Sequence, residues 1–63
     1  MNIEKAKQIM FLLSLGHTAS QIGGKVALRT RTVEKYLETL KAAHGAKNAP
    51  HLVGIAIRRK LIQ

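Results

Sequence analysis

The sequence predicts an all-α fold of four helices, arranged as one domain over residues 1–63. Three observations support this prediction. Apolar residues recur at helical spacing along the chain. Gly, Pro and helix-capping residues separate the periodic segments, and no long linker, repeat or low-complexity tract lies between them. A chain this short buries only about 60% of its unfolded surface, so a compact apolar core, self-association, or both must stabilise it.

The expected helices cover about residues 3–15, 19–25, 31–44 and 49–60. The first carries an apolar stripe and ends where Gly16 can take the left-handed conformation. The second begins at Thr18, whose hydroxyl can cap a helix while Gln21 reaches back to complete a capping box. Gly23 is unfavourable inside so short a helix, which favours close packing of another element against it over simple tolerance of a weak helix.

The third helix is expected to begin at Thr30 or Arg31, after a brief break, and to end at Gly45. Its apolar side chains share one side, and charged and small residues lie roughly opposite. The fourth helix follows from Asn48, a favourable N-cap, and from Pro50, which suits a first helical turn.

Net charge is the strongest compositional signal. Eleven Lys and Arg residues against three acidic residues give a formal charge of +8, which attracts polyanions. Nucleic acid is the first candidate partner. An anionic membrane surface is the second, but it requires the cations to gather on one helix face, whereas here they are spread along the chain. The apolar stretch of residues 9–13 is too short to span a bilayer. Together with the absence of cysteine, this leads us to expect a cytoplasmic protein without a membrane partner.

A short helix, a brief turn and a longer helix with a polar side form the pattern of a helix-turn-helix, whose second helix enters the major groove of DNA. A more specific signal is the string GHTASQIGGKVALRTRTVEKYLETL, followed by HGAKN and AIRRKLI. This sequence resembles the LuxR/GerE-type (NarL/FixJ-like) helix-turn-helix domain of bacterial transcription regulators over nearly the whole chain. The matching residues are Gly16, Thr18, Ile22, Leu28, Arg31, Thr32, Val33, Leu37, Gly45, Asn48, Ala56, Ile57, Arg58, Arg59, Leu61 and Ile62.

The resemblance implies a four-helix domain whose third helix reads the major groove of double-stranded DNA. We therefore expect a stand-alone, sequence-specific transcription regulator of bacterial or phage origin, associated with the nucleoid when it is bound to DNA. Arg31 and Lys35 are expected near base edges and the flanking cations at phosphates, and the start of the second helix can hold another phosphate. The candidate DNA-binding residues are Thr18, Ser20, Lys25, Arg29, Arg31, Glu34, Lys35, Glu38 and Lys41.

Glu34 and Glu38 depart from the family, in which the corresponding positions are often basic or polar. Three explanations remain open. The two carboxylates can accept hydrogen bonds from cytosine, they can be neutralised by nearby cations at helical spacing, or they indicate that DNA is no longer the target.

The fourth helix is apolar on nearly all sides, which indicates that both of its sides are covered. In many family members this helix makes a dimer contact, so we expect a homodimer whose contacts come from Leu52, Val53, Ala56, Ile57 and Lys60. The alternative is the ordinary aliphatic exposure of small domains.

A second candidate interface lies on the first helix, where Phe11 and Leu15 stand one turn apart, away from the apolar stripe. Coverage of Phe11 by the chain termini is the alternative. This pair supports a second hypothesis, in which the chain is a small interaction protein that pairs, through its first or fourth helix, with a larger regulator or with RNA polymerase.

The sequence gives no indication of catalysis, metal binding or a cofactor. Its three His residues are far apart and have no paired Cys or carboxylate spacing, and neither Ser lies in a nucleophile-elbow context. We therefore expect no catalytic residue, no metal site, no cofactor and no enzyme activity.

Overall fold

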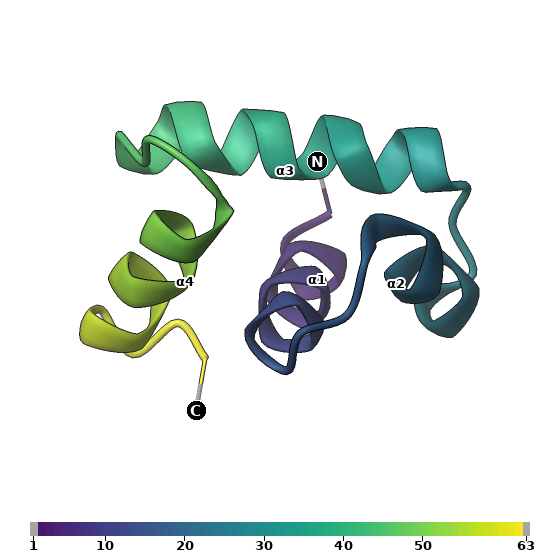
Figure 1. Cartoon of the computed structure of the whole chain (residues 1–63), viewed down its shortest axis with the longest axis horizontal. Coiled ribbons are helices and arrows are strands. Elements are labelled where there is room, and N and C mark those ends of the chain that lie inside the picture. Colours follow the sequence, from purple (N-terminus) through teal and green to yellow (C-terminus); the bar gives the residue numbers. More distant parts are fainter. Residues whose placement is uncertain (1, 63) are drawn as a thin grey trace.

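A computed structural model of the chain describes residues 2–62. It contains four α-helices and, within those residues, no strand, which confirms the all-α prediction. The helices are α1 (Ile3–Ser14), α2 (Ala19–Val26), α3 (Thr30–His44) and α4 (Ala49–Arg58). The longest helix, α3, lies across one side of the molecule, and α1, α2 and α4 pack beneath it, with α1 between the other two (Figure 1). None of the helices in this part of the chain is long and apolar enough to cross a membrane.

Side-chain caps fix the start of three helices. The predicted capping box is present: the Gln21 N–H donates to Thr18 Oγ1 at 3.2 Å, and the Thr18 N–H donates to Gln21 Oε1 at 2.9 Å. Asn48 caps α4 as expected, accepting the His51 N–H at 2.9 Å. Asn2 caps α1 in the same way, although no cap was predicted at this position. These bonds satisfy backbone donors that the first helical turns would otherwise leave unpaired.

Left-handed residues end the helices. Gly16 and Gly45 take positive φ values of 91° and 67°, as expected. The fourth helix ends at Arg58 rather than near residue 60, because Lys60 takes a left-handed φ of 58°. The Leu61 N–H then donates back to the Ala56 carbonyl at 2.8 Å. This is a Schellman ending, in which the reversed chain satisfies the last carbonyls.

The core consists of two clusters that share α1 and α3. One joins α1, α2 and α3 around the fully buried Ile9, Ile22 and Val33. The other joins α1, α3 and α4 around the fully buried Leu52 and Ala56, with Leu40 and Met10 beside them. Three half-buried side chains pack against both clusters: Leu13, Tyr36 and Leu37. Each large aliphatic side chain buried in this way contributes about 1.5–3 kcal/mol, so α3 is held along most of its length.

The turn between α2 and α3 is tightly packed. A Cβ atom on Gly23 would lie 2.6 Å from the carbonyl oxygen of Leu28, so only glycine fits there without a backbone shift, which confirms the predicted close approach. Gly24 next to it faces open space. The Lys5 ammonium group donates to the Val26 carbonyl at 2.5 Å, which attaches α1 to the C-terminal end of α2, where a cation also suits the helix dipole.

Candidate nucleic-acid interface

Helices α2 and α3, with the turn of residues 27–29 between them, form a helix-turn-helix arrangement. Ala27 takes a left-handed φ of 59°, which reverses the chain after α2. Gly23 allows the turn to pass directly against α2. The two helices are therefore joined by a close backbone contact as well as by the core side chains of α2 and α3.

The outward side of α3 is polar. Val33 and Leu40 are buried beneath the helix, whereas Arg31, Lys35 and Glu38 are exposed. At about 100° per residue, these three exposed residues point away from Val33 on the free side of the helix. A helix packed on one side and polar on the other can be inserted into a groove without unfolding the core.

The structure places the other predicted contact residues around this helix. Thr18 and Ser20 are exposed at the start of α2, Lys25 is exposed in its last turn, and Arg29 is exposed immediately before α3. The Thr18 oxygen already accepts a backbone hydrogen bond, so towards a phosphate its hydroxyl acts as a donor. Lys41 is the exception to full exposure, since its side chain is 27% exposed.

The two acidic residues of α3 differ in their surroundings. Glu38 is 75% exposed and forms an ion pair with Lys41 at 2.9 Å. The neutralisation expected from helical spacing is therefore present for Glu38. Glu34 is exposed, and no cation within residues 2–62 lies at ion-pair distance from it. An exposed ion pair contributes only about 0.2–1 kcal/mol to stability. The pair therefore matters mainly for the local charge, because Lys41 neutralises the Glu38 carboxylate.

Charge is divided unequally between this surface and the rest of the chain. The five cations of the candidate site, less Glu34 and Glu38, give a net charge of +3 out of the total of +8. The remaining +5 lies elsewhere, and the three consecutive residues Arg58, Arg59 and Lys60 are half of the six cations outside the site. The field of the whole chain attracts polyanions, but it is not concentrated on α3.

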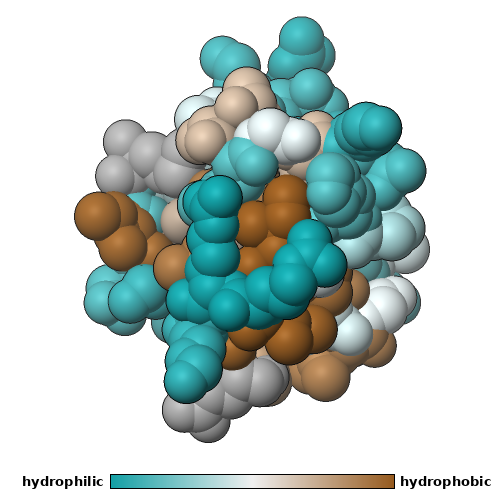
Figure 2. All heavy atoms as spheres, turned by 90° about the vertical axis from the view of Figure 1, so that its left-hand side faces the viewer, coloured by the Kyte–Doolittle hydropathy of each residue, from teal (hydrophilic) through white to brown (hydrophobic). Residues whose placement is uncertain are grey.

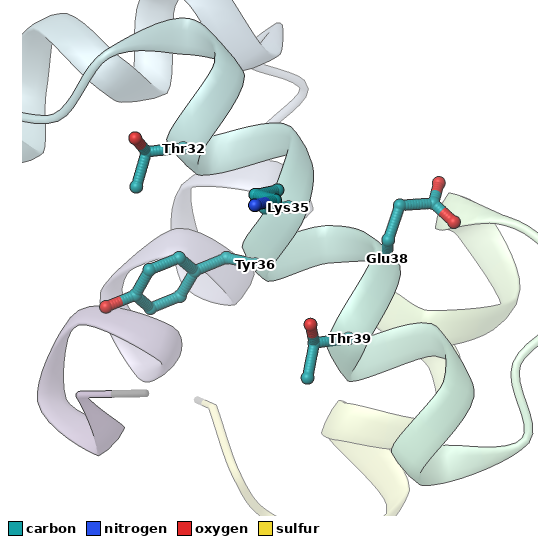
Figure 3. A pocket seen from close by; sticks show the side chains of 5 residues that line it. All are labelled: Thr32, Lys35, Tyr36, Glu38 and Thr39. Carbon is teal, nitrogen blue, oxygen red and sulfur yellow. The ribbon is translucent and has the colours of Figure 1, made fainter.

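A shallow groove runs along one flank of α3 (Figure 3). It is lined by Thr32, Lys35, Tyr36, Glu38 and Thr39. Tyr36 points from α3 towards the start of α1 (Figure 3), and its hydroxyl oxygen accepts the Asn2 N–H at 3.3 Å. Tyr36 is half-buried against both core clusters.

Thr32 and Thr39 were not among the predicted site residues. Their methyl groups are of the kind that contacts thymine in the major groove. The signal for them was present in the sequence, because helical spacing places both on the same flank of α3 as Lys35.

The structure corrects part of the predicted dimer contact. Leu52 and Ala56 are 0% exposed in the monomer core, so they cannot form an interface. Val53 is half-buried, Ile57 is 54% exposed, and Lys60 lies beyond the end of α4. The apolar character of α4 on nearly all sides is explained largely by its contacts with α1 and α3.

The candidate partner patch on α1 is on the surface. Phe11 is 42% exposed and Leu15 is 60% exposed, and the terminal residues 1 and 63, which the alternative would place over Phe11, lie outside the described residues. In the described part of the chain, His, Cys, Asp and Glu residues form no group of three that could hold a metal ion.

Comparison with protein-family models, with curated proteins and with solved structures gave no match to this chain.

Proposed function

We propose that this chain is a sequence-specific, DNA-binding regulator of transcription that inserts α3 into the major groove. The observation that carries the proposal is the helix-turn-helix arrangement of α2 and α3, in which α3 is packed on one side and exposes Arg31 and Lys35 on the other. The net charge of +8 supplies the long-range attraction to DNA.

Recognition is divided among the exposed side chains of α3. Arg31 and Lys35 suit the O6 and N7 acceptors of guanine, and Glu34 suits the amino group of cytosine. Glu38 is held by Lys41, so we assign base recognition to Glu34 in preference to Glu38. Thr32 and Thr39 supply methyl groups for contacts with thymine.

Phosphate contacts surround these base contacts. Lys25 and Arg29 lie at the end of α2 and in the turn, and Thr18 and Ser20 lie at the start of α2. Contacts of this kind orient a protein on the duplex without reading its sequence. A regulator of this type acts in the cytoplasm and associates with the nucleoid while bound.

Selection of bound sequences from random duplex DNA, at low and at moderate salt, tests the proposal. The unaltered chain is expected to enrich a defined sequence, and Lys35→Ala is expected to change that sequence. Arg29→Ala should preserve the sequence but make the slope of log affinity against log salt shallower by about 0.9, the value for one phosphate contact. Lys7→Ala is the matched control, since Lys7 is an exposed cation on α1 outside the site. Failure to bind any duplex at low salt would refute the proposal.

A second candidate function is an interaction protein that pairs with a larger regulator or with RNA polymerase. The exposure of Phe11 on α1 and of Leu15, the residue that follows the end of this helix, favours it. Replacing both residues with Ala should weaken such an association and leave DNA binding unchanged. If every protein association of the double variant equals that of the unaltered chain, this function is excluded.

Homodimerisation through α4 stays an untested alternative use of Val53, Ile57 and Lys60, the three predicted contacts that lie outside the core. Sedimentation of the chain over a range of concentrations, alone and with Ile57→Gln, tests it.

A further inference from the structure

Helix α4 exposes one apolar stripe. Pro50, Val53 and Ile57 follow one another at spacings of three and four residues, which places them on the same side of the helix. Pro50 is exposed, Val53 is half-buried and Ile57 is 54% exposed. The stripe continues into a groove of about 320 Å³ between the end of α1 and the start of α4, which is lined by Leu13, Ser14, Gly16, Ala49, Pro50 and Val53.

At the C-terminal end of α4, Arg58 and Lys60 lie near this stripe, whereas Arg59 turns towards α3. Arg58, Arg59 and Lys60 are all exposed. Arg59 Nη1 lies 3.1 Å from His44 Nδ1, so its guanidinium group is held against the end of α3. Arg58 Nη1 lies 4.0 Å from the position that a Cβ atom on Gly54 would take, so the Arg58 side chain extends back along α4. On this side of the molecule, hydrophilic side chains cross an apolar surface (Figure 2).

Two residues on this surface are unfavourable for folding. Gly54 lies inside α4, where glycine costs stability, and a Cβ atom there would meet nothing closer than the Arg58 guanidinium group. Packing within the chain therefore does not require glycine at this position. Lys60 occupies the left-handed position at which helices usually carry glycine.

We propose that this α4 surface, made of Pro50, Val53, Gly54, Ile57, Arg58 and Lys60, binds an acidic amphipathic helix of another protein. The apolar side of that helix covers the stripe, its Asp and Glu residues meet the cations, and Gly54 allows its backbone to approach closely. The inference does not depend on DNA binding by α3.

Charge distinguishes this partner from a second copy of the chain. The three acidic residues of the sequence are Glu4, Glu34 and Glu38, which lie on α1 and α3. A copy docked through α4 would therefore add cations to the interface, and its α4 surface carries no carboxylate to compensate them. Nucleic acid would satisfy the cations but would leave Val53 and Ile57 without an apolar partner.

Selection from a library of displayed helical peptides, with the exposed positions randomised, tests the proposal. On the immobilised full chain, the enriched peptides should place apolar residues at spacings of three and four and carry an excess of Asp and Glu. Arg58→Glu should weaken the binding of an enriched peptide by about tenfold, since it replaces an attraction with a repulsion of similar size. Lys7→Glu changes the net charge equally on α1, and it should leave peptide binding within about twofold of the unaltered chain, because exposed charges far apart are screened.

Gly54→Gln separates binding from folding. The change should raise the melting temperature, because glutamine favours a helix, and it should abolish peptide binding by filling the space over Gly54. Enriched peptides without acidic excess would overturn the proposal, as would equal effects of Arg58→Glu and Lys7→Glu. Self-association that Ile57→Gln abolishes and that no enriched peptide displaces would assign the surface to a second copy and overturn the proposal as well.

Discussion

Replacing Gly23 with Ala tests whether the turn between α2 and α3 depends on direct backbone contact. The added Cβ atom would lie 2.6 Å from the Leu28 carbonyl oxygen, and a backbone atom cannot move aside as a flexible side chain can. The turn is also tied to this residue, because the Leu28 N–H donates to the Gly23 carbonyl at 3.0 Å. We therefore expect α2 and the turn to separate, or the hydrogen bond to lengthen.

The expected magnitude follows from two opposing effects. Overpacking of this kind costs about 1–3 kcal/mol, and alanine recovers up to about 1 kcal/mol over glycine inside a helix. When the full helical gain is subtracted, a net loss of up to about 2 kcal/mol remains, which lowers the melting temperature of a domain this small by up to about 16 °C.

Gly24→Ala is the matched control. A Cβ atom there meets nothing within 4 Å, so only the helical gain applies, and the melting temperature should rise by a few degrees. Thermal unfolding followed by circular dichroism measures both variants. If Gly23→Ala proves as stable as Gly24→Ala, the close approach does not constrain the turn and the reasoning is refuted.

Three further predictions concern a cap, a helix end and an ion pair. Thr18→Ala removes the capping box and should cost about 1 kcal/mol, or about 4–8 °C in melting temperature, whereas Ser20→Ala should change it little; equal losses would show that the box is not the cause. Lys60→Gly should raise the melting temperature by a similar amount, because a non-glycine residue in the left-handed region costs about 1–2 kcal/mol; a lower melting temperature would contradict this. Glu38→Gln should tighten duplex binding by roughly fivefold at low salt, the effect of about 1 kcal/mol between nearby charges in water, and the gain should fade as salt is added; a gain that persists at high salt would have another cause.

Local signals in the sequence were sufficient for much of the fold. Thr18, Asn48, Gly16 and Gly45 mark helix ends through interactions with their own neighbours, so their roles could be predicted without knowledge of the packing. The early end of α4 could not be predicted from local signals. Lys60 is forced into a left-handed turn while Ile62 returns to the core, where it is 8% exposed, and this is a tertiary effect.

The candidate site, like the fold, could be predicted only in part from the sequence. Helical spacing correctly placed Arg31 and Lys35 on the exposed side of α3. It could not distinguish Glu34 from Glu38, since both have cations at suitable spacings, and only the structure pairs Glu38 with Lys41. On α4, apolar residues on nearly all sides did not reveal that Leu52 belongs to the monomer core.

The core connects the α4 surface to α3 through side chains that pack against both clusters. Leu13, Tyr36 and Leu37 pack against both clusters, so loosening of the α4 half would remove contacts from side chains that also support the α2 half. A ligand that binds only the folded state adds its binding free energy to the free-energy cost of local unfolding. Occupation of the α4 surface would therefore slow hydrogen exchange at the backbone amides of α3, which makes the exchange rate of one helix a reporter of events on another.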